Sequence, residues 1–297
     1  MRALWERWQR FWFHEVDPRR LAMLRIGFAL LALWTYLPML TELDWMLGDP
    51  GSFSVDSRLE HWTDSRWGLY ANPLWQIRDL AVIQGLFGLS LVALVCVGLG
   101  LGTRVAFPIA WILLASAMNR NPVWSDGSDA VLRVFGFYML FMPLGRAWSV
   151  DAWIRERYGL FPKLKSPSKW PLRLFQIQVC VLYVKTGVIK ATQPIWRDGD
   201  AVWHAMSAEP YWRFDASWFF QQEWFWWFTV AATYGTLVFE IGYPLMFLRR
   251  ARTWMLLAGL ALHLGIFVFL SLGGFSEAIL WTYLAFWVPA FMRRDRR

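Results

Sequence analysis

Long apolar stretches separated by short polar segments dominate this sequence. A membrane-spanning helix needs about 20 mostly apolar residues. Eight stretches reach or approach that length, near residues 20–40, 80–101, 104–119, 129–146, 172–191, 224–248, 254–272 and 276–292. The second and third are so close in sequence that they should form a tight hairpin. The pattern predicts an all-α integral membrane protein, a polytopic bundle of about eight transmembrane helices in a single domain over residues 1–297.

The basic residues are distributed unevenly among the segments between these stretches. If the chain starts on the cytoplasmic side and alternates, the inside segments hold 20 Lys and Arg residues and the outside segments hold six. Cytoplasmic loops of membrane proteins carry such an excess. The count predicts that both the N- and C-termini are cytoplasmic. It also accounts for the net charge of +8, so we expect the lipid bilayer as partner and no nucleic acid.

Composition supports the membrane assignment. Hydrophobic residues make up 57% of the chain, and 23 of its 297 residues are Trp. Indole rings favour the headgroup level of a bilayer, where they form aromatic belts. The first 19 residues mix aromatic and basic side chains, which is typical of an amphipathic helix lying on a membrane surface. Residues 1–19 are therefore predicted to form an interfacial helix of a multi-pass membrane protein.

Charged side chains inside the spans are rare, because each costs at least about 2.5–3.5 kcal/mol at the bilayer centre. Arg25 lies one turn into the first span, where its side chain can reach the headgroups. Arg133 follows Asp129 by four residues, so the two are expected to pair. Glu240 lies deeper and is the better candidate for a functional partner. His263 is more typical of a hydrogen-bonded core residue, and the sequence predicts no metal site because it has no Cys/His cluster.

The segment around Lys190 is the most informative polar feature. Helical spacing places Tyr183, Thr186, Gly187 and Lys190 on one stripe, with Lys185 on a different face. Gly187 lets another backbone or a flat ligand approach closely. Apolar surroundings disfavour a charged ammonium group, and a neutral amine is a usable general base. Lys190 is therefore a candidate catalytic base, and the alternative is that it extends to the outer membrane surface. The residues alone leave both interpretations open.

Two segments on the predicted outer side, 41–79 and 192–223, are rich in aromatic residues. The simpler interpretation is that their Trp side chains are interfacial anchors. The alternative is a docking surface for a partner peptide, with Trp203 and Trp212 as the residues to test.

Four stretches, ordered along nearly the whole chain, resemble the HTTM (horizontally transferred transmembrane) family, whose best-known members are the vitamin K-dependent γ-glutamyl carboxylases. Each motif is short, and the ordered set is what makes the resemblance specific. The stretches are residues 16–27 with Val16-Asp17-Pro18; residues 125–133 with Asp126-Gly127-Ser128-Asp129, followed by Pro143-Leu144-Gly145; residues 178–199 with Tyr183, Gly187, Lys190 and Trp196; and Glu240 with His263 and the turn at 274–276.

The resemblance implies a membrane enzyme that uses a reduced, vitamin K-like quinol with O2 and CO2. In the family's carboxylases a lysine deprotonates the quinol, oxygen converts it to a strong base, and that base removes a γ-proton from a glutamate before CO2 adds. Lys190 stands at the place of that lysine in the Gly-x-x-Lys pattern. The candidates for binding the cofactor are Tyr183, Gly187, Glu240, His263 and Trp203.

The sequence also departs from the carboxylases. It ends after the last predicted span, where they have a large extra-membrane region for the protein substrate, and their paired lysines become Ile189-Lys190. These differences weigh against glutamate carboxylation itself, although a peptide or protein substrate remains an expected partner. Short bacterial relatives share this form, which predicts a bacterial inner membrane. The alternative function is a non-enzymatic membrane protein for maturation, insertion or export of a partner peptide. A transporter is a third, weaker possibility.

Overall fold

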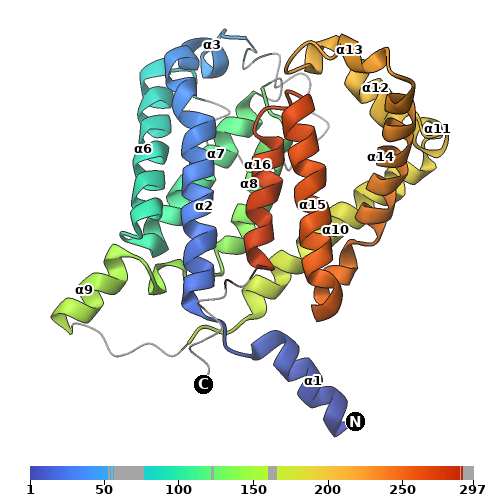
Figure 1. Ribbon diagram of the computed structural model, residues 1–297. Helices are drawn as coiled ribbons and strands as arrows, with labels where there is room; N and C mark the ends of the chain where they lie inside the picture. Colours follow the sequence, from blue (N-terminus) through green and yellow to red (C-terminus); the bar gives the residue numbers. More distant parts are fainter. Residues whose placement is uncertain are drawn as a thin grey trace. The chain divides into compact units, whose positions relative to one another are not determined.

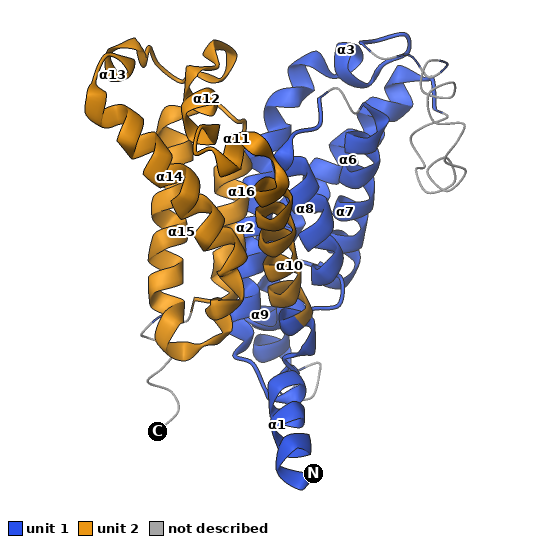
Figure 2. Ribbon diagram, turned by 90° about the vertical axis from the view of Figure 1, so that its right-hand side faces the viewer, with its two compact units in different colours: residues 1–173, 288–297 blue, residues 174–287 orange. Residues whose placement is uncertain are grey.

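The structure is a computed structural model that describes residues 1–52, 54, 56, 77–121, 124–159, 166–287 and 289. Within these residues the chain is helical, and its β-structure is limited to isolated bridges joining Glu15 to Ser168 and Trp212 to Leu270. The chain divides into two compact units, Met1–Arg173 with Val288–Arg297 and Leu174–Trp287 (Figure 2). The all-α prediction is confirmed for the described residues, and the single domain over 1–297 stays a prediction.

Unit 1 is a set of helices (Figure 1), several of which begin at capping residues recognisable in the sequence. Side chains of Asp17 and Asp79 accept backbone N–H groups at the starts of α2 and α6, as preferred N-cap residues do. α6 packs against both α2 and α7. The helices are α1 (Arg2–Phe13), α2 (Pro18–Tyr36), η1 (Leu37–Glu42), α3 (Leu43–Leu47), α6 (Leu80–Leu99), α7 (Thr103–Arg120), α8 (Gly127–Met139), η2 (Leu144–Arg146) and α9 (Val150–Tyr158).

α6 and α7 form the tight hairpin that the sequence predicts. The chain reverses at Gly100 and Gly102, whose φ angles are 75° and 56°. A Cβ atom at Gly100 would lie only 2.2 Å from Cβ of Ser149, so the turn needs glycine for space as well as for its left-handed backbone. The Asp151 carboxylate accepts the N–H groups of Gly102 and Thr103 at 2.8 and 3.0 Å. These bonds fix the start of α9 beside the hairpin.

Unit 2 takes most of α10 (Trp170–Thr192), whose first residues, through Arg173, are assigned to unit 1. α14 packs against α12 and α15, and α15 packs against α16. The helices after α10 are α11 (Pro194–Arg197), α12 (Ala201–Ser207), η3 (Glu209–Tyr211), α13 (Ser217–Phe220), α14 (Glu223–Ile241), η4 (Tyr243–Phe247), α15 (Arg249–Phe269), α16 (Phe275–Thr282) and η5 (Tyr283–Ala285).

Among the described residues, four helices are long and apolar enough to cross a membrane: Pro18–Leu47, Leu80–Leu99, Trp170–Thr192 and Arg249–Phe269. They correspond to the predicted spans near 20–40, 80–101, 172–191 and 254–272. The count of eight spans and the cytoplasmic placement of both termini stay predictions.

The other four predicted spans coincide with helices of different lengths. α7 matches 104–119 closely. α8 ends at Met139 rather than near 146, and Pro143 follows shortly after, as a helix-ending residue does. α14 ends at Ile241 rather than 248, because Pro244 disfavours α-helix in the residue before it. α16 and η5 together end at Ala285, and most of 286–292 lies outside the described residues.

α1 has the amphipathic composition expected of the N-terminal segment. None of its residues is buried, and Trp5 and Trp8 are exposed. The helix ends at Phe13 rather than near residue 19, since the following residues pair with a second segment. Val16 N–H donates to the Pro167 carbonyl, and Lys169 N–H donates to the His14 carbonyl. Placement of α1 on a membrane surface stays a prediction.

Arg25 does not extend to the headgroups, so that expectation is wrong. Its side chain is fully buried and donates to the carbonyl oxygens of Leu144, Ala147 and Trp148. Carbonyl groups beyond a helix end lack the partners that a continuing helix would supply. Arg25 supplies them, which explains how a guanidinium group is tolerated at this depth in the unit.

Candidate functional site

α10 presents the polar stripe that its sequence predicts. Tyr183 and Gly187 are buried, Lys190 is partly exposed, and Lys185 on the other face is exposed. Lys190 follows Tyr183 by seven positions, which is about two helical turns, or roughly 10 Å. The stripe therefore carries two polar groups at different heights, or levels, along α10, Lys190 and the Tyr183 hydroxyl. Each contacts a different set of partners within unit 2.

The first level is an ion pair between Lys190 and Glu240 of α14. Lys190 Nζ lies 2.5 Å from Glu240 Oε1, with side-chain exposures of 30% and 7%. Lys190 Nζ also lies 4.7 Å from the centre of the Trp196 ring, within reach of a cation–π interaction. Lys190 is thus held between a carboxylate and an indole, so it does not extend freely to the surface.

Gly187 makes this pairing possible. A Cβ atom at Gly187 would lie 2.9 Å from Glu240 Cβ and 3.1 Å from the backbone nitrogen of Ile241. Side chains essentially never approach so closely, so only glycine lets α10 come this near to the end of α14. The prediction of a close approach at Gly187 is confirmed, and the approaching group is a helix of this chain.

The second level is a hydrogen-bonded cluster around the Tyr183 hydroxyl. This oxygen lies 2.7 Å from His263 Nε2 and 2.7 Å from the Tyr283 hydroxyl. The Tyr183 ring stacks on Tyr243 with centroids 4.1 Å apart and planes at 19°. The cluster therefore joins α10, η4, α15 and η5, and His263 is the hydrogen-bonded core residue that the sequence predicts.

Three buried polar atoms of this region have no hydrogen-bond partner among the described residues: Glu240 Oε2, His263 Nδ1 and the Tyr243 hydroxyl. Leaving such a group unsatisfied costs about 1–3 kcal/mol. Native structures seldom leave several unsatisfied together without a reason. These three atoms are therefore the open hydrogen-bonding positions of the region.

The structure brings together five of the six residues nominated from the sequence: Lys190, Glu240, Tyr183, Gly187 and His263. Trp203 of α12 is the exception. Its ring packs on Phe220, Phe225 and Trp226. Trp226 precedes Glu240 on α14 by 14 residues, or about 21 Å of helix. Trp203 therefore belongs to an aromatic cluster at the opposite end of α14.

Sequence reasoning missed Tyr243 and Tyr283 as members of the cluster. One signal was available for Tyr283. A Cβ atom at Gly259 would lie 2.1 Å from the Tyr283 hydroxyl, so this glycine in α15 marks the place where a large side chain lies against the helix. Pairing such a glycine with a particular tyrosine requires the fold.

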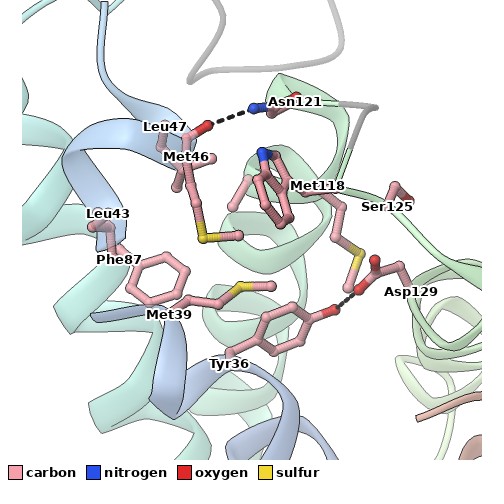
Figure 3. Close-up of a pocket in the computed structure, with 12 residues that line it drawn as sticks. Tyr36, Met39, Leu43, Met46, Leu47, Phe87, Met118, Asn121, Ser125 and Asp129 are labelled. Carbon is pink, nitrogen blue, oxygen red and sulfur yellow. Dashed lines mark hydrogen bonds between the residues drawn. The ribbon is translucent and has the colours of Figure 1, made fainter. Parts of the chain in front are cut away.

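A separate small cavity lies in unit 1, beside the Tyr36–Asp129 hydrogen bond of 2.5 Å (Figure 3). Methionines 39, 46 and 118 extend toward it, and its volume is about 30 Å³, room for about two water molecules. Asp129 pairs with Tyr36, and Arg133 donates to Asn119, so the expected Asp129–Arg133 pair is wrong. The cavity is too small for a quinone-sized ligand.

In the part of the chain that the structure describes, no group of three or more His, Cys, Asp and Glu side chains is placed to hold a metal ion.

Comparison with known proteins gives one family. Residues 13–291 match the model described as the HTTM domain. No curated protein and no solved structure matches the chain.

Proposed function

Since the chain belongs to the HTTM family, whose domain it matches over residues 13–291, we propose that it is a carboxylase-like membrane enzyme. It uses a reduced quinone with O2 and CO2, and Lys190 serves as the general base at the outer membrane face. The observation that carries the proposal is the ion pair between Lys190 and Glu240, whose atoms lie 2.5 Å apart. Lys190 is also the lysine of the Gly-x-x-Lys pattern that resembles the family's.

The pair supports the proposal because it can accept one proton as a unit. Lys190 Nζ donates to Glu240 Oε1 at 2.5 Å, which holds the lysine side chain in one position. A neutral amine at this position can take the proton of a bound hydroxyl group. Glu240 then stabilises the ammonium group that forms, through a charge-assisted hydrogen bond.

The residues present fit a quinol. A quinol has a flat ring and two hydroxyl groups, and the unpartnered Glu240 Oε2, Tyr243 hydroxyl and His263 Nδ1 offer complementary acceptors and donors. Glu240 and Lys190 are suited to hold one hydroxyl and take its proton. When bound, a quinol supplies the reducing equivalents that O2 consumes. Tyr183 orients His263 through their hydrogen bond, and a peptide or protein would be the substrate that is carboxylated.

The proposal is tested by extracting the full chain gently from membranes and identifying bound quinones by mass spectrometry. We expect a quinone with the wild type and a clear fall in occupancy with Tyr243→Phe, with Glu240→Gln and with Lys190→Ala. The matched control for charge loss on α10 is Lys185→Ala, because Lys185 is exposed on the other face. Absence of quinone from the wild type, or equal occupancy in all variants, contradicts the proposal.

A second candidate function, docking of a peptide for maturation or export, is favoured by exposed aromatic residues between α10 and α14. Tyr211, Phe214 and Trp218 are 51%, 41% and 59% exposed. By contrast, Trp212 donates its ring N–H to the Met206 carbonyl and is structural. Loss of a co-purifying peptide on Trp218→Ala, but not on Lys190→Ala, would favour docking over the enzyme.

A further inference from the structure

A polar cavity of about 150 Å³ lies in unit 1, and none of the residues that line it belongs to the candidate functional site. Its lining carries three cationic side chains against one carboxylate. The residues that line it are Arg10, His14, Glu15, Val16, Arg20 and Lys169. A concave site with this excess of positive charge is suited to bind an anion.

The cavity is a built feature rather than a chance gathering of surface charges. Val16 N–H donates to the Pro167 carbonyl at 2.9 Å, and Lys169 N–H donates to the His14 carbonyl at 3.0 Å. These two bonds hold the segment after α1 beside the segment before α10. Arg20, in the first turn of α2, is 9% exposed. Three parts of the chain are therefore fixed around the cavity.

The helices that begin beside the cavity indicate its level relative to a membrane. Arg20 lies in the first turn of the candidate span Pro18–Leu47, and Lys169 directly precedes the candidate span Trp170–Thr192. The ends of membrane-spanning helices lie at the level of the lipid headgroups. α1 contributes Arg10 to the cavity and ends directly before His14. With its exposed Trp5 and Trp8, it has the composition of an interfacial helix.

We propose that this cavity binds the phosphate of an anionic phospholipid headgroup, with Arg10, Arg20 and Lys169 as its cationic contacts. Arginine presents a planar fork of donors that matches phosphate oxygens, and lysine adds a compact point charge. Basic pockets at the ends of membrane helices bind anionic headgroups in this way. Phosphatidylcholine is disfavoured, because its choline cation would face the same positive side chains.

The test is native mass spectrometry of the full chain in a neutral detergent, titrated with phosphatidylglycerol or phosphatidylcholine of identical acyl chains. We expect tighter binding of phosphatidylglycerol. The double variant Arg10→Gln/Lys169→Gln should weaken that binding about tenfold or more, because it removes two of the three cationic contacts to the phosphate. Buried Arg20 is left intact so that the variants fold.

Arg2→Gln/Arg7→Gln is the matched control, because it also removes two positive charges, both from α1, and neither residue lines the cavity. It should change binding less than twofold. Equal binding of the two lipids, or an equal loss with Arg2→Gln/Arg7→Gln, overturns the proposal. A separate arm adds inorganic phosphate alone. If it raises the melting temperature as much as phosphatidylglycerol does, the site takes a free anion rather than a lipid.

Discussion

Lys190 Nζ and Glu240 Oε1 are 2.5 Å apart, on helices α10 and α14, which approach closely only because residue 187 is glycine. This ion pair fixes the position of the Lys190 side chain on the polar stripe of α10. It gives a carboxylate partner to a lysine that the sequence presents as a lone charge within a predicted span.

The first prediction concerns the pair itself. Lys190→Met or Glu240→Gln should each lower stability, because each leaves the other group without its charged partner in a poorly hydrated place. The double variant should lose less than the sum of the single losses, with a coupling energy of about 1–3 kcal/mol. Unfolding measured in detergent checks this. Additive losses would show that the two groups do not interact.

The second prediction concerns Gly187. Gly187→Ala should force α10 away from Glu240 and destabilise the chain by about 1–3 kcal/mol, the range for overpacking. Gly235→Ala in α14 is the control, because a Cβ atom there meets nothing within 4 Å. That change should be neutral or stabilising by up to about 1 kcal/mol, the helix preference of Ala over Gly. Similar melting temperatures for the two variants would refute the close approach.

The third prediction concerns Tyr183. Tyr183→Phe keeps the ring that stacks on Tyr243 but removes the oxygen that joins His263 and Tyr283. Stability should fall by about 1–3 kcal/mol, the cost of leaving buried polar groups unsatisfied. Thermal unfolding beside Tyr234→Phe, whose hydroxyl bonds at an exposed position, provides the comparison. A loss no larger than that of the exposed variant would contradict the cluster.

The fourth prediction concerns Arg25. Arg25→Met should destabilise unit 1 strongly, by about 3 kcal/mol or more, because three hydrogen bonds to carbonyl groups, one buried and two partly buried, are lost. Arg104→Gln, an exposed arginine on α7, should change stability by less than about 0.5 kcal/mol. Protease resistance of the two variants distinguishes these outcomes. If both behave alike, Arg25 does not hold the segment after α8.

Much of the site could be predicted from the sequence, because the helical period fixes which side chains share a face. Tyr183, Gly187 and Lys190 could be grouped for this reason, and Glu240 could be singled out by its depth. Tyr243 and Tyr283 could not. They lie in the short segments η4 and η5. The direction in which these side chains point depends on the backbone conformation where α14 and α16 end, and the helical period of the sequence does not determine it.

The partners of Arg25 and Arg133 could not be predicted from the sequence either. The sequence shows that Arg25 lies one turn inside a span, but the carbonyl groups that it meets are more than 100 residues away. Asp129 and Arg133 have ideal spacing for a pair, yet each has a partner from another helix, Tyr36 and Asn119. Tertiary contacts here outweigh a local pairing that contributes only about 0.2–0.5 kcal/mol.

We propose that Lys190, paired with Glu240, is the base of a quinol-dependent enzyme, and oxygen uptake by the purified chain supplied with a reduced menaquinone analogue measures this activity. Lys190→Arg keeps the positive charge beside Glu240 but cannot give up its proton. The account predicts quinol-dependent uptake by the wild type and by Lys185→Arg, and a loss of about 100-fold or more with Lys190→Arg, in line with removal of a general base. Equal uptake by Lys190→Arg and Lys185→Arg, or no quinol-dependent uptake by the wild type, would contradict it.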